Sequence, residues 1–474
     1  MSVALERKKK KKVNHPFYAL TVMVIIVAIA THIIPAGEFS RTVVDGRTIV
    51  DPTSYELVAK NPTTIADFFQ SFYFGFKKAS GVMGLVFFIG GAFGVIKGMG
   101  LLDIAVKEIT NKVKSKGILL IAPIVMTAIF FNVTFTGMRE LDVIFVTLMI
   151  PICISLGYDT MTALGVVLVG SVAGFAPALA NPFFTGIAHE IAELPIYSAM
   201  WYRALIAGIF LITGIIYVIW YANKVKKDPS KSLMADLDSE QELRKFYEKN
   251  EVDSQTVDFS LRMKLAGLSF LLLFGFMIFG TLKLNFGFAQ LSGVFVAMVI
   301  VPGLIGGLSG NEICDYFNRG CADILTAVLI IFFARSILVL LEDARIIDTI
   351  IHTLAGFITG TSSTVAAVLV YISQTIINFV IPSGSGQAVI TMPIITPLAD
   401  IGEINRQVAC LASQLGDGLT NYIYITNGGL LAVLAIAKVP YTKWVKFFLP
   451  LFLFYSVVAG VFIAAAQIID LGPF

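Results

Sequence analysis

A short polar run, "IPSGSGQ" at 381–387, interrupts a long apolar segment of the chain. Pro382 lacks a backbone N–H and ends a helix, while Gly384 and Gly386 permit a tight turn. A helix that begins after this turn directs free N–H groups and the positive end of its dipole at a ligand, which suits a carboxylate. The carbonyl groups that end the preceding helix can bind a cation. The run therefore predicts a site for a small anion, with Ser383 and Ser385 as direct contacts.

Three other polar breaks repeat the pattern: "NVTFTG" at 132–137, "ALANPFFTG" at 178–186 and "DGLTNYIYITNGG" at 417–429. Irregular backbone persists in lipid only where it is buried in protein or lines a cavity, and paired breaks are typical of a transporter site at the bilayer midplane. The candidate substrate-binding residues are Asn132, Thr134, Thr136, Gly137, Arg139, Glu140, Asn181, Pro182, Ser383, Gly384, Ser385, Gly386, Gln387, Asp417, Asn421 and Asn427.

Few charged residues lie within the apolar segments, so each is a functional candidate. Arg139, Glu140 and Asp142 follow the first break, and Asp417 lies in the last one. A structural ion pair, or a hydrogen bond that stabilises the break, is the alternative for the acidic residues. Arg335 lies inside an expected span at 322–342, where an internal ion pair or snorkelling to the membrane surface competes with substrate contact.

The elements that must position these residues are membrane helices. The chain has 474 residues, of which 57% are hydrophobic and 14% charged, with a mean hydropathy of +0.83; a soluble protein has about 25% charged residues. Apolar runs of about 18 residues or more recur and are continuous rather than alternating, which predicts an all-α polytopic membrane protein.

Several function classes are excluded by the same composition. The net charge of +3 carries no nucleic-acid signal, since the basic residues cluster in short loops and at the ends. No Walker A loop, HExxH or suitably placed GxSxG is present, so we expect no enzyme activity and no cofactor. Gradient-driven transport, with Na⁺ or H⁺ as the coupling ion, is the simplest interpretation.

The chain divides into two halves around a charged linker. We expect a first repeat at 1–222, a cytoplasmic linker at 223–264 and a second repeat at 265–474. The hairpins are expected at 117–155 and 364–402, and the broken helices at 160–192 and 406–437. Asn132, Pro151 and Asn181 each precede a residue of the same type by 246 positions (378 − 132, 397 − 151 and 427 − 181).

Lys and Arg gather at the N-terminus and in 107–116, 223–264 and 438–446, which places these segments in the cytoplasm. Given this placement, the order of the spans predicts that the two hairpins enter the membrane from opposite faces, which is typical of an inverted repeat. It also predicts that the C-terminus lies outside the cell. The span at 289–308 has no counterpart in the first half. The glycines of "GGAFGVIKGMG" at 90–100 are interpreted as helix-packing residues.

The segments "NFVIPSGSGQAVITMPIITPLAD", "LASQLGDGLTN" and "LAIAKVPYTKWVKFFLPLF" resemble the YfcC-type carriers of the anaerobic dicarboxylate carrier group, within the ion transporter superfamily. The resemblance covers nearly the whole chain and includes "LGYDTMTALGVVLVGSVAGFAPALANPFFTGIA" in the first half. It implies two inverted repeats, each with a re-entrant hairpin and an unwound helix. It also implies an elevator-type movement, a homodimer and a bacterial plasma membrane location. It places the hairpin tips at 132–140 and 382–387 and the unwound segments at 181–182 and 417–427.

Members that this chain resembles are described as basic amino acid antiporters or as carboxylate carriers. We therefore expect a membrane-embedded transporter with a small-molecule substrate, most simply an arginine/ornithine exchanger in which Glu140 or Asp417 meets the cationic end. The alternative is a Na⁺- or H⁺-coupled carrier of di- or monocarboxylates in which Arg139 binds a carboxylate through both of its nitrogens. Many members that this chain resembles have two acidic residues after "G-M-x". Here the sequence is "GMREL": Glu140 remains, Leu141 takes the second place and Arg139 adds a positive charge, which weakens the case for a cationic substrate. A channel or a membrane scaffold is the remaining class.

Overall fold

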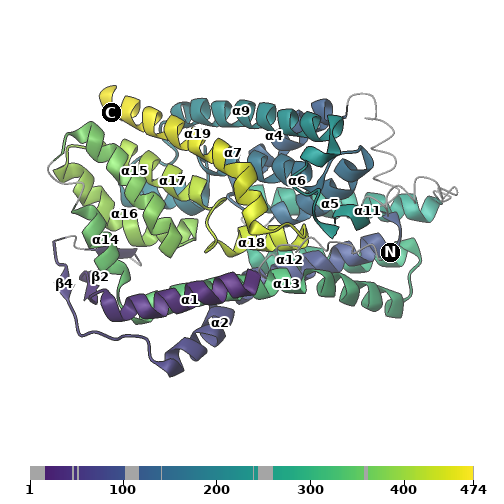
Figure 1. The fold of residues 1–474 in the computed structure, drawn as a ribbon, viewed down its shortest axis with the longest axis horizontal. Helices are drawn as coiled ribbons and strands as arrows, with labels where there is room; N and C mark the ends of the chain where they lie inside the picture. Colours follow the sequence, from purple (N-terminus) through teal and green to yellow (C-terminus); the bar gives the residue numbers. More distant parts are fainter. Residues whose placement is uncertain are drawn as a thin grey trace, which may run out of the picture.

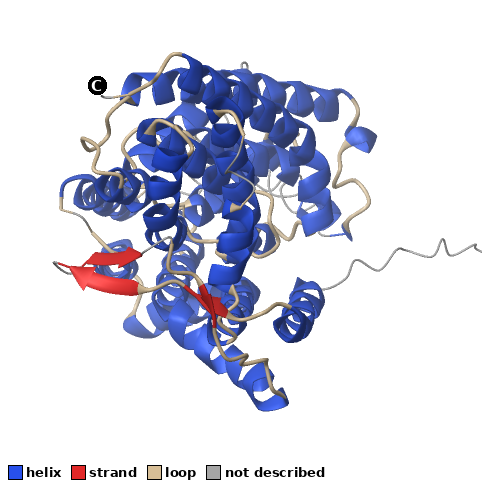
Figure 2. Cartoon of the chain, turned by 90° about the vertical axis from the view of Figure 1, so that its left-hand side faces the viewer, coloured by secondary structure: helices blue, strands red, loops and turns tan. Residues whose placement is uncertain are grey.

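The computed structural model describes residues 16–44, 47–50, 53–101, 117–139, 141–238, 240–243, 260–284, 286–356 and 361–472. It is built of helices, with two short β-ribbons at one end (Figure 1, Figure 2). The first-half helices are α1 Pro16–Ile33, α2 Ile65–Gly98, α4 Ile118–Thr136, α5 Asp142–Ser155, α6 Thr160–Leu164, η1 Gly165–Val169, α7 Gly170–Phe175, η2 Pro182–Gly186, α8 Ile187–Ile191 and α9 Met200–Lys227. The linker contributes η3 Pro229–Lys231, and the second-half helices are α11 Leu261–Lys283, α12 Phe288–Gly306, α13 Gly310–Asp343, α14 Ile347–Ala355, α15 Ser363–Val380, α16 Gly384–Ile401, α17 Arg406–Thr420, α18 Gly428–Ile436 and α19 Tyr441–Ile468.

Six of the described helices are long and apolar enough to cross a membrane: α2, α4, α9, α12, α15 and α19. The bent helix α13 makes a seventh if its two parts, which meet at 46°, form one span. Helices thus occupy the apolar runs that the sequence predicts as membrane-embedded. Part of the predicted linker (239 and 244–259) and the basic segment 107–116 lie outside the described residues.

The apolar runs at 79–98 and 322–342 predict spans of ordinary length, but helices α2 and α13, which contain them, are longer. Each has 34 residues, or about 51 Å of helix against a hydrocarbon core of about 30 Å. The physical reason is a capping box ahead of each apolar run: Thr64 with Asp67, and Ser309 with Glu312. Hydropathy locates only the part of such a helix that meets lipid, whereas the cap sets where it begins.

Helices α2 and α13 cross without side chains between their backbones. A Cβ atom at Gly320 would lie 2.2 Å from the carbonyl oxygen of Gly90, and one at Gly94 would lie 2.4 Å from that of Tyr316. Only glycine fits at such distances. The prediction that the glycines of 90–100 mediate helix packing is confirmed.

The first predicted hairpin comprises α4 and α5, which are separated at 137–141. Helix α4 continues through Thr136, so the break predicted from Asn132 onward was placed too early. Gly137 ends the helix with φ of +67°, and its N–H donates to the carbonyl of Val133 at 2.8 Å. Polar residues at membrane depth were mistaken for irregular backbone, although a helix holds them readily.

The second predicted hairpin comprises α15 and α16, and only 381–383 between them is non-helical. Gly384, Ser385, Gly386 and Gln387 form the first turn of α16 rather than a loop. Likewise α17 extends to Thr420, so the last break spans 421–427 and Asp417 lies within a helix. In the first half, the helical run 160–175 is followed by a bend and then by the π-helical turn η2.

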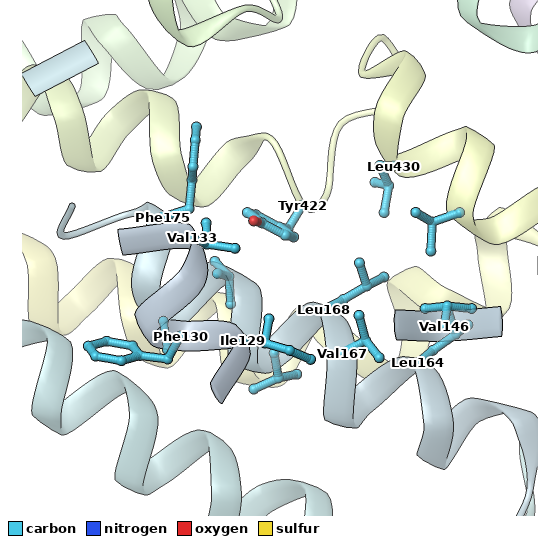
Figure 3. Close-up of a cluster of buried hydrophobic side chains, with 14 of the residues drawn as sticks. Ile129, Phe130, Val133, Val146, Leu164, Val167, Leu168, Phe175, Tyr422 and Leu430 are labelled. Atoms are coloured by element: carbon cyan, nitrogen blue, oxygen red, sulfur yellow. The ribbon is translucent and has the colours of Figure 1, made fainter. Parts of the chain in front are cut away.

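The two hairpins pack in corresponding ways. Helix α4 contacts α7 and α9, and α15 contacts α17 and α19. Helices α9 and α19 lie along the upper edge of Figure 1, while α1, α12 and α13 lie along the lower side. Figure 3 shows the buried cluster in which Val133, Leu168, Phe175, Tyr422 and Leu430 meet, joining the first-half helices to the segment between α17 and α18 and to α18.

A polar excursion between α1 and α2 contains the two ribbons. Strand β1 Gly37–Glu38 pairs with β4 Glu56–Leu57, and β2 Arg41–Val44 pairs with β3 Arg47–Val50, both antiparallel. Arg41 forms a two-bonded ion pair with Asp348 of α14 at 2.7 and 2.6 Å. Tyr55 stacks on His352 with ring centroids 3.9 Å apart. The excursion is therefore fastened to α14, the short helix that precedes the second hairpin.

Candidate functional site

A cavity of about 240 Å³ lies where the breaks of the two halves meet. Its volume is close to the lower end of ligand pockets, about 300 Å³, which suits a small solute. One wall is formed by Gly137, Met138, Arg139, Phe175, Asn181, Phe184, Pro382, Ser383, Gly384, Ser385, Thr426, Asn427, Gly428 and Gly429. The facing wall is formed by Val82, Phe288, Ile331, Ala334, Arg335 and Leu338. The cavity thus lies between the four broken segments and helices α2, α12 and α13.

Arg139 is held chiefly by aromatic rings. Its guanidinium carbon lies 4.8 Å from the ring centroid of Phe175 and 5.1 Å from that of Tyr422. Its nitrogens donate at 3.4 Å to the carbonyl of Asn421 and at 3.4 Å to Oδ1 of Asn427. Both hydrogen bonds are long, so the strong donors of a guanidinium are available for a planar anion.

The hydroxyl of Tyr422 is held by a hydrogen bond to Ser171. Ser171 lies 2.6 Å from it and donates to Oδ2 of Asp142 at 2.7 Å. Ser171, Asp142 and Tyr422 are all buried. The ring that supports Arg139 is therefore anchored to both α7 and α5, which keeps the arginine at a set position in the cavity wall.

Asp417 is fully buried and uses one oxygen. Its Oδ1 accepts from Nδ2 of Asn378 at 2.6 Å and from Nδ2 of Asn421 at 3.0 Å. Among the described residues, its Oδ2 and the Oδ1 of Asn378 have no hydrogen-bond partner. The Oδ2 atom faces the first turn of α16, since a Cβ at Gly384 would lie 3.3 Å from it. Glycine at 384 lets the helix start approach this carboxylate.

Asn378 and Asn421 extend this contact in both directions. Asn421 accepts from Asn427 at 2.6 Å, and Asn427 in turn accepts from Arg139. On the other side, Asn378 donates to Gln387 at 3.0 Å, and Gln387 donates to Gln374 at 2.8 Å. A continuous chain of side-chain hydrogen bonds therefore runs from Arg139 to the inside of the second hairpin.

The N-terminus of α16 opens on the cavity. Ser383 is its N-cap, with Oγ accepting from the N–H of Gly386 at 3.4 Å, and its carbonyl accepts from the N–H of Gln387 at 2.7 Å. The first N–H groups of a helix lack intrahelical partners, so those at Gly384 and Ser385 can bind an anion. Asn427 caps α18 in the same way, accepting from the N–H of Leu430 at 2.9 Å.

The structure brings seven of the sixteen sequence-predicted residues to the cavity wall, and others lie elsewhere. Thr134 accepts from the N–H of Leu179 at 3.1 Å, and Thr136 accepts from that of Met138 at 3.1 Å. The wall includes Gly137, Arg139, Asn181, Ser383, Gly384, Ser385 and Asn427. Asp417, Asn421 and Gln387 belong to the chain of hydrogen bonds. Gly386 lies in the first turn of α16, and Asn132 lies on α4. Glu140 and the side chain of Pro182 lie outside the described residues.

The wall also includes residues outside the predicted set, among them Phe175, Phe184, Thr426 and Arg335. Tyr422, whose ring supports Arg139, was not predicted either. Phe175 and Phe184 flank "APALANPF", and an arginine at membrane depth needs either an acid or an aromatic face. That requirement was the available signal for the aromatic residues. The sequence marks Arg335 as a charge at membrane depth but does not indicate that its helix faces the breaks.

Two curated relatives match nearly the full chain. One, from Escherichia coli (strain K12), is named "Putative basic amino acid antiporter YfcC" and is 28% identical over 509 residues, covering 99% of each chain. Another, from Haemophilus influenzae (strain Rd), carries the name "Uncharacterized protein" and is 28% identical over 488 residues, covering 94% of this chain and 95% of its own.

Two solved structures resemble the fold more distantly. The YdaH transporter of Alcanivorax borkumensis matches with a TM-score of 0.40 and 16% identity, covering 96% of this chain and 98% of its own. MtrF of Neisseria gonorrhoeae, described with a class of antimetabolite efflux pumps, matches with a TM-score of 0.41 and 16% identity, covering 96% and 95%.

The family model described as "DcuC: C4-dicarboxylate anaerobic carrier" matches residues 14–468. This match covers nearly the whole chain. The membrane-spanning helices and the cavity at their breaks agree with it. The protein is therefore a multi-pass membrane protein and belongs to the DcuC family of carriers.

Proposed function

We propose that this protein is a secondary carrier for small carboxylates. The observation that supports this proposal best is the charge of the cavity wall. The described wall residues include two cations, Arg139 and Arg335, and no acidic side chain. The N-terminus of α16 adds its N–H groups and positive dipole end to the same wall. A substrate carboxylate would meet Arg139 through the edge of the guanidinium that the two aromatic rings leave accessible.

Exchange of basic amino acids, such as arginine for ornithine, is the second candidate. The name of the Escherichia coli relative favours it. Asp417 lies close behind Gly384 and could balance a cationic side chain, with Glu140 following Arg139 in the chain. In this alternative the α-carboxylate of the amino acid would occupy the start of α16.

Counterflow into proteoliposomes tests the two candidates. Vesicles are loaded with unlabelled succinate, arginine or ornithine, and labelled succinate or labelled arginine is added outside. Uptake of succinate driven by internal succinate supports the carboxylate carrier. Uptake of arginine driven only by internal arginine or ornithine replaces it with the amino acid exchanger. Flux that needs neither internal substrate nor an ion gradient points to a channel.

We also propose that Asp417 and Asn378 hold the coupling ion, H⁺ or Na⁺. Both side chains are fully buried, and each has one oxygen without a hydrogen-bond partner among the described residues. Two such oxygens on hydrogen-bonded neighbours provide lone pairs for a cation. Accumulation under an imposed pH gradient or Na⁺ gradient identifies the ion.

Alternating access by an elevator-type movement of two inverted repeats is proposed for the transport cycle. Three features support it. Helices α2 and α13 have equal lengths, and both ends differ by 245 positions (310 − 65 and 343 − 98). The packing of α4 on α7 and α9 corresponds to that of α15 on α17 and α19. The cavity lies where the breaks of the two halves meet and faces α2, α12 and α13.

We propose that the protein lies in a bacterial plasma membrane with its N-terminus inside the cell and its C-terminus outside. We also propose that it assembles as a homodimer. Lys224, Lys226 and Lys227 at the end of α9 support the orientation. In a chain freed of its native cysteines, a cysteine at position 472 should react with an impermeant maleimide in intact cells, whereas one at 230 should require permeabilisation. Cross-linking in membranes, followed by mass measurement, tests the dimer.

A further inference from the structure

The two walls of the cavity differ in their chemistry. The wall made by the four broken segments presents hydroxyl, amide and guanidinium groups. The facing wall consists of Val82, Phe288, Ile331, Ala334 and Leu338, all apolar, together with Arg335. Within the described part of the chain, Arg335 is thus the one polar side chain that this wall contributes.

Arg335 faces the cavity because of its position on α13. The cavity-lining residues 331, 334, 335 and 338 follow the i, i+3, i+4, i+7 spacing of a single helix face. Ser336 lies on another side of the helix, against α2, where a Cβ at Gly75 would lie 2.5 Å from its hydroxyl oxygen. Helix packing therefore fixes the rotation of α13 and directs its 335 position at the substrate space.

The stretch of α13 around Arg335 is otherwise uncharged. Between Asp323 and Glu342 every other residue is neutral, and most are large and apolar. A guanidinium in such a stretch costs free energy in a membrane and is typical of a functional position. Ile331 and Ala334 beside it touch Gly428 of α18, whose Cβ would lie 3.2 and 3.5 Å away. Arg335 thus lies at the seam where α13 meets the broken segments.

We propose that Arg335 is a specificity-determining residue that binds a second anionic group of the substrate. The inference rests on the proposed carboxylate transport. One carboxylate would meet Arg139 and the start of α16, and the other would meet Arg335 across the cavity. A substrate with a neutral far end would lose this charge-assisted contact, and one with a cationic far end would be repelled.

Comparing substrates of equal backbone length but different charge tests the proposal. Succinate, monomethyl succinate and 4-aminobutyrate end in an anionic, a neutral and a cationic group. Initial rates of uptake into proteoliposomes are measured for wild type, Arg335→Gln and Arg335→Lys. Arg319→Gln is the matched control, because Arg319 lies on the same helix over the ring of Tyr316, at 5.7 Å, and does not line the cavity.

Arg335→Gln should raise the KM for succinate about tenfold while changing that for monomethyl succinate about threefold or less, because only the dianion loses a charged partner. Arg335→Lys should keep part of the preference, and the control should keep all of it. If both KM values rise equally, Arg335 has a structural role and the inference is wrong. Unchanged KM values contradict it as well.

The measurement on wild type separates this inference from the proposed function. If wild type moves neither carboxylate, the carboxylate carrier is excluded and Arg335 loses its proposed partner. If wild type moves both carboxylates with the same KM, the carrier stands and the charge discrimination is excluded. Should Arg335→Gln fail to assemble in detergent, the ratio of the two KM values in Arg335→Lys decides, since lysine keeps the charge but not the two-pronged geometry.

Discussion

Arg139 and Tyr422 come from opposite halves of the chain, yet the guanidinium carbon of one lies 5.1 Å from the ring centroid of the other. Phe175 covers the arginine from another side at 4.8 Å. Replacing Arg139 with lysine keeps the charge but loses the planar group, so the KM for a carboxylate substrate should rise about tenfold. Transport kinetics in proteoliposomes measure this.

Lys224→Gln is the control for Arg139→Lys, since Lys224 lies over the ring of Trp220 at the end of α9, outside the cavity wall. Its KM should equal that of wild type. An Arg139→Lys variant with wild-type KM would show that the guanidinium plane has no part in substrate binding.

Asp417→Asn should retain exchange but lose accumulation driven by the ion gradient. Asparagine keeps the Oδ1 that accepts from Asn378 and Asn421, while the carboxylate charge proposed to hold the ion is removed. Counterflow and gradient-driven uptake, measured on the same vesicles, separate the two effects. Asp315→Asn on the exposed part of α13 is the control, and gradient-driven uptake by Asp417→Asn would exclude the carboxylate as the ion site.

Asp417→Ala should in addition destabilise the protein. It removes one acceptor from each of two buried amides, Asn378 and Asn421, at about 1–3 kcal/mol for each N–H left unsatisfied. Each amide keeps its other bond, from Asn378 to Gln387 and from Asn421 to the carbonyl of residue 417. Thermal unfolding in detergent should therefore rank wild type and Asp417→Asn above Asp417→Ala. Equal unfolding temperatures for all three would mean that the chain of amides does not depend on this residue.

Gly320→Ala should weaken the crossing of α2 and α13 by about 1–3 kcal/mol, because the new methyl group would lie 2.2 Å from a carbonyl oxygen. Gly84→Ala on α2 is the matched control, since a Cβ there meets no atom within 4 Å. The unfolding temperature in detergent should fall only for the first variant. A stable Gly320→Ala variant would refute the close crossing.

The ion pair of Arg41 with Asp348 should contribute measurably to the attachment of the ribbons, because the Asp348 side chain is only 6% exposed. A double-mutant cycle with alanine at both positions should give a coupling energy of about 1 kcal/mol, measured by thermal unfolding. The exposed pair of Asp228 with Lys231 serves as the comparison and should show no coupling. Equal results for the two pairs would mean that the ribbon is held by other contacts.

A disulfide between positions 428 and 334 should block transport reversibly. The Cβ of Ala334 lies 3.5 Å from where a Cβ at Gly428 would lie, within the range for a disulfide. In a background without the native cysteines, oxidation would fix α18 to α13, and reduction should restore uptake. Undiminished transport by the oxidised protein would exclude relative movement at this seam, and with it the elevator proposal in this form.

The positions of the breaks could be predicted from sequence because proline, glycine and clustered polar residues act locally. Pro382 and Gly137 mark real helix ends. The breaks are shorter than the sequence predicts, because Thr136 and Asp417 form their hydrogen bonds from within helices. Thr136 accepts from the N–H of Met138, and Asp417 accepts from Asn378 of the second hairpin. A polar residue at membrane depth indicates that a hydrogen-bond partner is nearby. It does not by itself indicate that the backbone is irregular.

The supporting residues of the site could not be predicted, because they depend on contacts between distant segments. Phe175 and Tyr422 look like ordinary core residues in sequence, and only the meeting of the two halves brings them to Arg139. Arg335 depends in the same way on how α13 is rotated by the glycines of α2. The substrate, the coupling ion, the repeat symmetry and the homodimer stay predictions.

The two carboxylate oxygens of Asp417 differ in their hydrogen bonds, and this difference has a consequence for the transport cycle. Both amide donors point at Oδ1, and Oδ2 is left toward the helix start at Gly384. A cation could arrive at or leave Oδ2 without any hydrogen bond to Oδ1 being broken. The charge at this carboxylate could then be neutralised while its hydrogen bonds stay in place. The first part of the second hairpin to meet that change would be the start of α16 at Gly384.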